Sequence, residues 1–230
     1  MVHAATTAST SGPRRAADRT RVPIVLLGAL VGIVGLLAWW GVWRGEYVFD
    51  DFPAIALNGE LLAGDGWGAA FSPDHHPLAN RLLSCWSLAA DFRLFGQGPF
   101  GPHLTNLLLH LVNGMLVVAV VRAALTSPNL AGRFPMARAT WIATAVAMLW
   151  VAHPLGGDSV AYATQRSTLL AGAFLLVAMG AALRAARATH PVRWRALAVF
   201  AVACGMASKE DMVVAPLLLL VWERAFVLPT

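Results

Sequence analysis

Charge is scarce in this chain of 230 residues: Asp, Glu, Lys and Arg make up 13% of it, while 58% of its residues are hydrophobic. Soluble domains carry about 25% charged residues, so this shortage excludes an ordinary soluble domain. A disordered chain is excluded too, because so apolar a composition would not stay solvated in an open form. The composition therefore predicts a protein that crosses a membrane several times.

Lysine and cysteine are nearly absent as well. The basic residues are 16 arginines and the single Lys209, scattered between apolar runs rather than gathered on one face. This pattern excludes a nucleic-acid-binding domain, despite a net charge of +5. The two cysteines, Cys85 and Cys204, lie too far apart in sequence to predict a metal cluster, and one pair makes no disulfide framework.

Long apolar runs are what the chain has in abundance. A membrane-spanning helix needs about 20 apolar residues. The first run meets this length without a charge and is too long for a signal peptide, so we expect a retained anchor that follows a basic tail at residues 1–21. We predict an all-α membrane helix bundle of about six spans. These are residues 22–42, 103–121, 137–152, 167–183, 194–207 and 212–222.

The positive charges give this bundle an orientation. With the N-terminus in the cytoplasm, twelve of the seventeen basic residues fall inside and ten of the twelve acids fall outside. Since basic residues are enriched in cytoplasmic loops, the pattern predicts a multi-pass protein of the cell membrane with a cytoplasmic N-terminus.

The first outer loop, about residues 44–102, is too rich in Trp, Phe, Leu and acids to be a linker. Apolar residues recur at near-helical spacing over residues 78–94, which predicts an amphipathic helix on the membrane surface. Asp50 and Asp51 begin this loop. Two adjacent carboxylates could include a general base, or could hold a divalent metal ion through their oxygens. The simpler alternative is an acidic pair that only follows the membrane topology.

Further polar residues gather on the same predicted side. His103, Asn106, His110 and Asn113 form one stripe on the second span, of which the deeper two, His110 and Asn113, are expected to bond helix to helix. Cations are rare on the outer side, so Lys209 and Arg166 could bind an anion such as a lipid phosphate. A salt bridge to Glu210, Asp211 or Asp158 is the alternative for them.

Several short motifs, in one order, resemble the transmembrane-and-tetratricopeptide-repeat O-mannosyltransferases and their bacterial relatives. The resemblance covers residues 46–222. The matching motifs are Tyr47-Val48-Phe49-Asp50-Asp51, His76-Pro77-Leu78, Leu94-Phe95-Gly96, Pro99 to Asn113, His153-Pro154 with Arg166, and Ser208-Lys209-Glu210.

This resemblance implies a GT-C type glycosyltransferase. Such an enzyme moves a sugar, here mannose-like, from a polyprenyl-phosphate carrier to an acceptor hydroxyl of a protein or glycan on the extracytoplasmic face. By motif position the catalytic base is Asp50, with Asp51 beside it, and Arg166 and Lys209 would stabilise the leaving phosphate. The residues expected to bind substrate are His76, His103, Asn106, His153, Asp158, Arg166, Lys209 and Glu210.

The chain also departs from the family pattern. It has His76 where relatives usually carry Arg, and Asp158 where a longer acid is usual. No tetratricopeptide repeats are present, and we expect the membrane domain, residues 22–230, to be truncated at its C-terminus. Two alternatives therefore stay open: a non-catalytic or truncated membrane module that needs a partner chain, and a transporter of lipid-linked saccharides.

Overall fold

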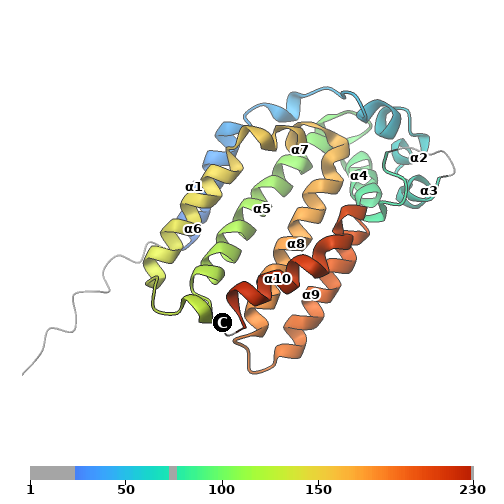
Figure 1. Ribbon diagram of the computed structural model, residues 1–230. Helices are drawn as coiled ribbons and strands as arrows, with labels where there is room; N and C mark the ends of the chain where they lie inside the picture. Colours follow the sequence, from blue (N-terminus) through green and yellow to red (C-terminus); the bar gives the residue numbers. More distant parts are fainter. Residues whose placement is uncertain (1–23, 73–76, 229–230) are drawn as a thin grey trace, which may run out of the picture.

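The computed structural model describes residues 24–72 and 77–228, and all regular structure in these ranges is helical. The predicted all-α class is confirmed. Each predicted span contains a helix, and Figure 1 shows the six gathered into one bundle. They are α1 (Ile24–Ala38), α5 (Phe100–Leu125), α6 (Met136–Val151), α8 (Arg166–Ala185), α9 (Pro191–Met206) and α10 (Ala215–Phe226).

Three segments of the described chain are long and apolar enough to cross a membrane: Val25–Arg44, Phe100–Leu125 and Ala163–Ala185. A fourth span is formed if α6 is taken together with Pro154–Ala161, across a bend of 60°. Pro154 explains the break, because proline disfavours helix at the preceding residue and cannot donate a backbone hydrogen bond. Helices α9 and α10 have 16 and 12 residues, short of the usual 20. Six spans therefore remain a prediction.

The bundle is built around α5 and α8, which pack against each other, with α6 on the free side of α5 and α9 on that of α8 (Figure 1). Small side chains allow close approach. Ala178 and Ala181 of α8 meet Ala198 and Ala201 of α9 in one buried cluster, the kind of contact that brings membrane helices together. On the other side, a Cβ added at Gly114 of α5 would collide with Val151 of α6.

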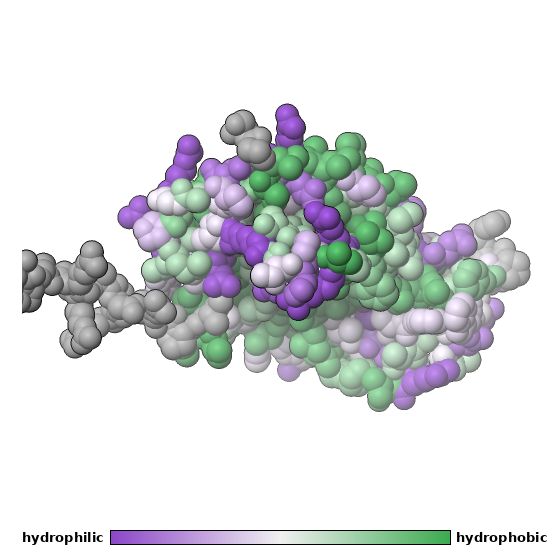
Figure 2. Space-filling view, turned by 90° about the horizontal axis from the view of Figure 1, so that it is seen from below, coloured by the Kyte–Doolittle hydropathy of each residue, from purple (hydrophilic) through white to green (hydrophobic). Residues whose placement is uncertain are grey.

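The two ends of the bundle differ in character. The α5–α6 and α8–α9 connections lie at the lower end in Figure 1, and residues 44–72 and 77–99 cover the opposite end, called here the loop end. Figure 2 looks onto the lower end, where hydrophilic residues cluster near the middle beside hydrophobic ones. Arg184 and Arg187, where α8 ends, are exposed. These two arginines, which are among the basic residues predicted inside, and the loop predicted outside thus lie at opposite ends.

The first loop is a folded unit with its own core. Its helices are η2 (Phe52–Ala56), α2 (Gly59–Leu62), α3 (Gly66–Ala70) and α4 (Leu82–Phe95). Ile55, Leu61, Leu88 and Phe92 belong to one buried cluster of this unit. A helix, α4, is therefore present where the sequence predicts one, and its exposed side carries apolar residues such as Trp86. That this helix is amphipathic and lies on the membrane surface remains a prediction.

Short helical turns complete the loop end. They are η1 (Val42–Arg44), η4 (Pro154–Gly156), α7 (Gly157–Ala161), η5 (Ala163–Gln165) and η6 (Glu210–Val214). The remaining turn, η3 (Pro128–Leu130), lies in the α5–α6 connection at the lower end.

Candidate active site at the loop end

The two adjacent carboxylates of the first loop have different surroundings. Asp51 is fully buried, and its Oδ1 accepts hydrogen bonds from the backbone N of Thr164 at 2.9 Å and from its hydroxyl at 2.8 Å. Its Oδ2 accepts one from the N of Ala163 at 3.2 Å. Asp51 therefore ties the loop to the start of α8, whereas Asp50 is exposed and leaves its carboxylate accessible to solvent.

Tyr47 and His103 lie close to the hydrogen-bonded carboxylate of Asp51. His103 is completely buried, and its ring centroid is 6.4 Å from that of Tyr47. Burial, and then the negative charge of Asp51, raise the pKa of the Tyr47 phenol to about 12. Tyr47 thus stays a neutral hydroxyl at physiological pH. His103, predicted to bind substrate, lies beneath the loop rather than on an open surface.

Arg166, also predicted to bind substrate, is completely buried and paired with a residue that the sequence did not single out. Its Nη2 lies 2.6 Å from Oδ2 of Asp91 on α4 and also donates to the carbonyl of Pro102 at 3.0 Å. Its Nη1 donates to Ser87 at 3.0 Å, and its Nε donates to Asn106 at 2.5 Å. All three guanidinium nitrogens are engaged, so these contacts join α4, α5 and α8.

Asn106 takes part in the same buried network. Its Oδ1 accepts from Arg166, and its Nδ2 donates to the carbonyl of Tyr162 at 2.7 Å. Both ends of the amide are therefore occupied by the protein. As found, neither Asn106 nor Arg166 presents a free polar group to a ligand, and the ion pair expected for Arg166 with Asp158 or the Glu210–Asp211 pair is replaced by one with Asp91.

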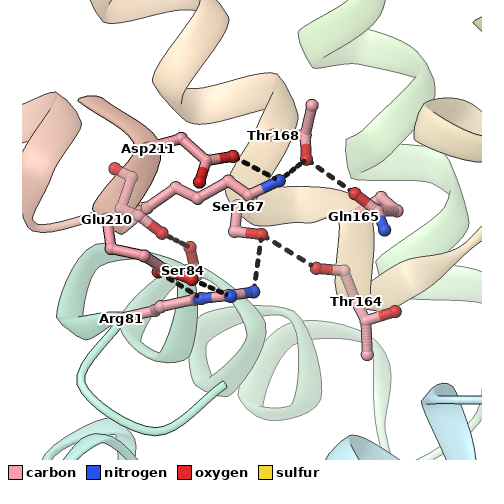
Figure 3. A network of polar contacts seen from close by, with 10 residues as sticks. Arg81, Ser84, Thr164, Gln165, Ser167, Thr168, Glu210 and Asp211 are labelled. Atoms are coloured by element: carbon pink, nitrogen blue, oxygen red, sulfur yellow. Dashed lines mark hydrogen bonds and ion pairs between the residues drawn. The ribbon is translucent and has the colours of Figure 1, made fainter. Parts of the chain in front are cut away.

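A second polar network, shown in Figure 3, lies where α4, the start of α8 and η6 meet. Arg81 makes two hydrogen bonds to the carboxylate of Glu210, at 2.6 and 3.0 Å, and a longer one to Ser167 at 3.4 Å. Lys209 lies 3.2 Å from Asp211 and donates to the hydroxyl of Thr168 at 3.1 Å. The ion pair expected as the alternative for Lys209 is thus present.

These two cations remain within reach of solvent. The side chains of Arg81 and Lys209 are 20% and 21% exposed, and those of their acidic partners are 66% and 71% exposed. The hydrogen bonds from Arg81 lower the pKa of Glu210 below its usual value. Sequence reasoning missed Arg81, although the signal that selected Arg166 and Lys209, a cation on the side poor in cations, applies to it equally.

The remaining predicted residues are less tightly held. His153 and Asp158 are exposed, and Nδ1 of His153 accepts a hydrogen bond from the backbone N of Leu155. His76 lies outside the described residues. Within the part of the chain that the structure describes, no group of three or more His, Cys, Asp or Glu side chains could hold a metal ion.

Comparison with known proteins supports the resemblance seen in the motifs. The chain is 32% identical over 185 residues to the protein O-mannosyl-transferase Tmtc2 of Drosophila melanogaster, a match that covers 74% of the chain and 18% of that protein. It is 29% identical over 203 residues to the protein O-mannosyl-transferase TMTC4 of Mus musculus, covering 79% of the chain and 27% of that protein. The chain is a homologue of the protein O-mannosyl-transferases.

This homologue spans about a fifth to a quarter of the length of the curated relatives that it matches. No protein-family model matches the chain, and no solved structure does so either. The described chain thus combines kinship with the protein O-mannosyl-transferases and helices that are long and apolar enough to cross a membrane.

Proposed function

We propose that the chain is the membrane part of a GT-C type glycosyltransferase that uses a polyprenyl-phosphate carrier. It transfers a mannose-like sugar to an acceptor hydroxyl at the loop end, which faces the extracytoplasmic side in a bundle of about six spans. The names of its homologues, protein O-mannosyl-transferases, support the reaction class. The opposite placement of the loop and the exposed arginines supports this orientation.

The contrast between Asp50 and Asp51 is the observation that carries the proposal. Asp51 is held by Ala163 and Thr164, so the neighbouring Asp50 has a fixed backbone and a free carboxylate. In the proposed reaction the acceptor oxygen attacks the anomeric carbon and its proton passes to Asp50. The bond from that carbon to the phosphate oxygen breaks, and polyprenyl phosphate leaves. A carboxylate in contact with the hydroxyl is suited to this role.

The leaving phosphate needs a positive partner, and Lys209 is the better placed of the two cations expected to supply one. It is partly exposed, and it bonds Thr168, one helical turn beyond the Thr164 that holds Asp51. Arg81 lies in the same network. Donors aimed at developing charge are among the largest contributions to catalysis. We assign the binding of the leaving phosphate to Lys209 and Arg81. When it binds, the phosphate replaces Glu210 and Asp211 as the partner of these two cations.

Sugar transfer in membranes that contain the chain tests the proposal. With radiolabelled polyprenyl-phosphate mannose as donor, Asp50→Asn is expected to lower transfer by about 10²–10⁴-fold, the usual contribution of a general base. Glu60→Gln is the matched control, an exposed acid of the same loop, and should leave transfer unchanged. Absence of transfer by an inserted wild-type chain would contradict the proposal and favour a non-catalytic module.

A further inference from the structure

A cavity of about 340 Å³ lies at the lower end of the bundle, between the ends of α5 and α8 and the start of α9. This volume is within the range of about 300–1,000 Å³ that is typical of small-molecule sites. Two residues that line it, Met136 and Leu197, are 57% and 37% exposed, so the cavity opens onto the surface. The cavity and the candidate active site lie at opposite ends of the molecule (Figure 1).

The lining of the cavity changes from apolar to basic along the helix axes. On α5 it extends from Leu116 to Thr126, a rise of about 15 Å. The half nearer the middle of the bundle is lined by small or apolar residues, which are Leu116, Ala119, Val120, Leu176, Val177 and Gly180. The half at the helix ends carries Arg122, Arg184 and Arg187. A phospholipid has the same order of polarity, because its acyl chains point to the membrane centre and its headgroup lies at the surface.

The positive charge of this basic half is not balanced by an acid among the described residues that line the cavity. Arg187, just beyond α8, reaches across to α5, where its Nη1 donates a long hydrogen bond of 3.4 Å to the hydroxyl of Thr126. The guanidinium of Arg184 lies over the ring of Trp194, 5.1 Å from its centroid. Arg122 has no side-chain hydrogen bond or ion pair within the described ranges. The charges of Arg122 and Arg187 are therefore available to an anion.

The chemistry of the lining selects a phosphate and disfavours a zwitterionic headgroup. Guanidinium groups match a phosphate in charge and in geometry. A zwitterionic headgroup would also bring an ammonium group, for which the described lining offers no carboxylate. Trp194 does not offer it a free aromatic ring either, because Arg184 and Arg193 already lie over this ring, at 5.1 and 5.4 Å. Basic pockets between membrane helices on the cytoplasmic side, where we predict this end to lie, are typical sites for anionic lipids.

We propose that the cavity between α5, α8 and α9 binds an anionic phospholipid. Its phosphate lies against Arg122 and Arg187, and its acyl chains follow the apolar half of the cavity. Arg184 stays against Trp194 and forms part of the wall. This binding goes beyond the proposed function, because it requires neither Asp50 nor a sugar donor.

Native mass spectrometry of the purified, delipidated full chain in detergent tests this site. With dioleoyl-phosphatidylglycerol as the probe, we expect one lipid to bind saturably, and dioleoyl-phosphatidylcholine to bind about tenfold more weakly. The double variant Arg122→Gln with Arg187→Gln should weaken binding of phosphatidylglycerol by about 25-fold, since each basic residue near an anionic lipid contributes about a factor of five. Arg138→Gln with Arg224→Gln is the matched control. It removes the same charge from exposed positions outside the cavity and should bind as wild type does.

A second pair of variants tests the apolar half without changing any charge. Gly180 lines the cavity, and a Cβ there would lie 3.6 Å from Val120, so Gly180→Val narrows the space for an acyl chain. We expect it to weaken binding of phosphatidylglycerol. Gly172→Val, on the same helix but outside this cavity, should bind as wild type does; a Cβ there would lie 3.8 Å from Asn113.

Three outcomes would overturn the proposal. Equal binding of the two lipids would remove the preference for an anionic headgroup. Equal weakening by the two arginine pairs would show that only the overall charge of this end attracts the lipid, and equal binding by Gly180→Val and wild type would show that no chain enters the cavity. Inorganic phosphate is the last probe: displacement of the lipid by an equal concentration of phosphate would assign the site to a free anion instead.

Discussion

Two arginines at the loop end each pair with a carboxylate at 2.6 Å, but their surroundings are opposite. Arg166 and its partner Asp91 have side chains that are 0% and 6% exposed, while those of Arg81 and Glu210 are 20% and 66% exposed. Charges interact strongly where water is excluded, and weakly where solvent screens them. The difference shows that distance alone does not define a role: Arg166 belongs to the scaffold, and Arg81 is a cation that a ligand can reach.

The same division separates the two adjacent carboxylates. Asp51 has its oxygens occupied by donors from Ala163 and Thr164, whereas Asp50 is exposed. A buried group that is fully bonded resists change and fixes geometry. An exposed group next to it stays accessible to a ligand, which is why we propose the reactive role for Asp50 and a structural role for Asp51.

Loss of Arg166 should have the largest effect on stability. Arg166→Met leaves Asp91 buried and unpaired, which is expected to cost about 3–5 kcal/mol in the free energy of unfolding. Thermal unfolding of the purified chain in detergent, followed by circular dichroism, measures this change.

Two further variants sharpen this result. The double variant Arg166→Met with Asp91→Leu should recover most of the loss, because it removes the stranded charge. Arg184→Met, an exposed arginine of the same helix, should change stability by less than about 0.5 kcal/mol. Equal effects of Arg166→Met and Arg184→Met would show that burial does not separate the two arginine environments.

Loss of Asp51 should have an intermediate effect. Asp51→Ala leaves the backbone donors of Ala163 and Thr164 without their acceptor, at a cost of about 1–3 kcal/mol. Asp50→Ala, its exposed neighbour, is expected to cost less than about 0.5 kcal/mol. Urea unfolding of both variants compares them directly, and a larger loss for Asp50→Ala would reverse the assigned roles.

The sequence predicted what depends on local pattern. Apolar runs located the six helices of the bundle, because length and continuous hydrophobicity are local properties. It could not give the number of spans, since the lengths of α9 and α10 fall short of a full crossing.

The sequence could not predict contacts between residues that lie far apart along the chain. Asp91 lies 75 positions before Arg166, and Thr164 lies 113 positions after Asp51. Only the fold brings these pairs together, so sequence reasoning treated Arg166 and Lys209 as equivalent cations and the two aspartates as one pair. Burial is what distinguishes the members of each pair.

The pair formed by Arg81 and Glu210 should have the smallest effect, and one that depends on pH. Arg81 lowers the pKa of Glu210 in the folded chain, so the pair stabilises the fold at neutral pH. That contribution is present above the usual value of 4.5 and is lost as the pH falls through the lowered pKa. Because the pair is exposed, Glu210→Gln should cost less than about 1 kcal/mol at pH 7. The difference between the unfolding temperatures of wild type and variant should shrink as the pH is lowered into the acid range, whereas a difference that does not depend on pH would show that Glu210 stabilises by packing rather than by charge.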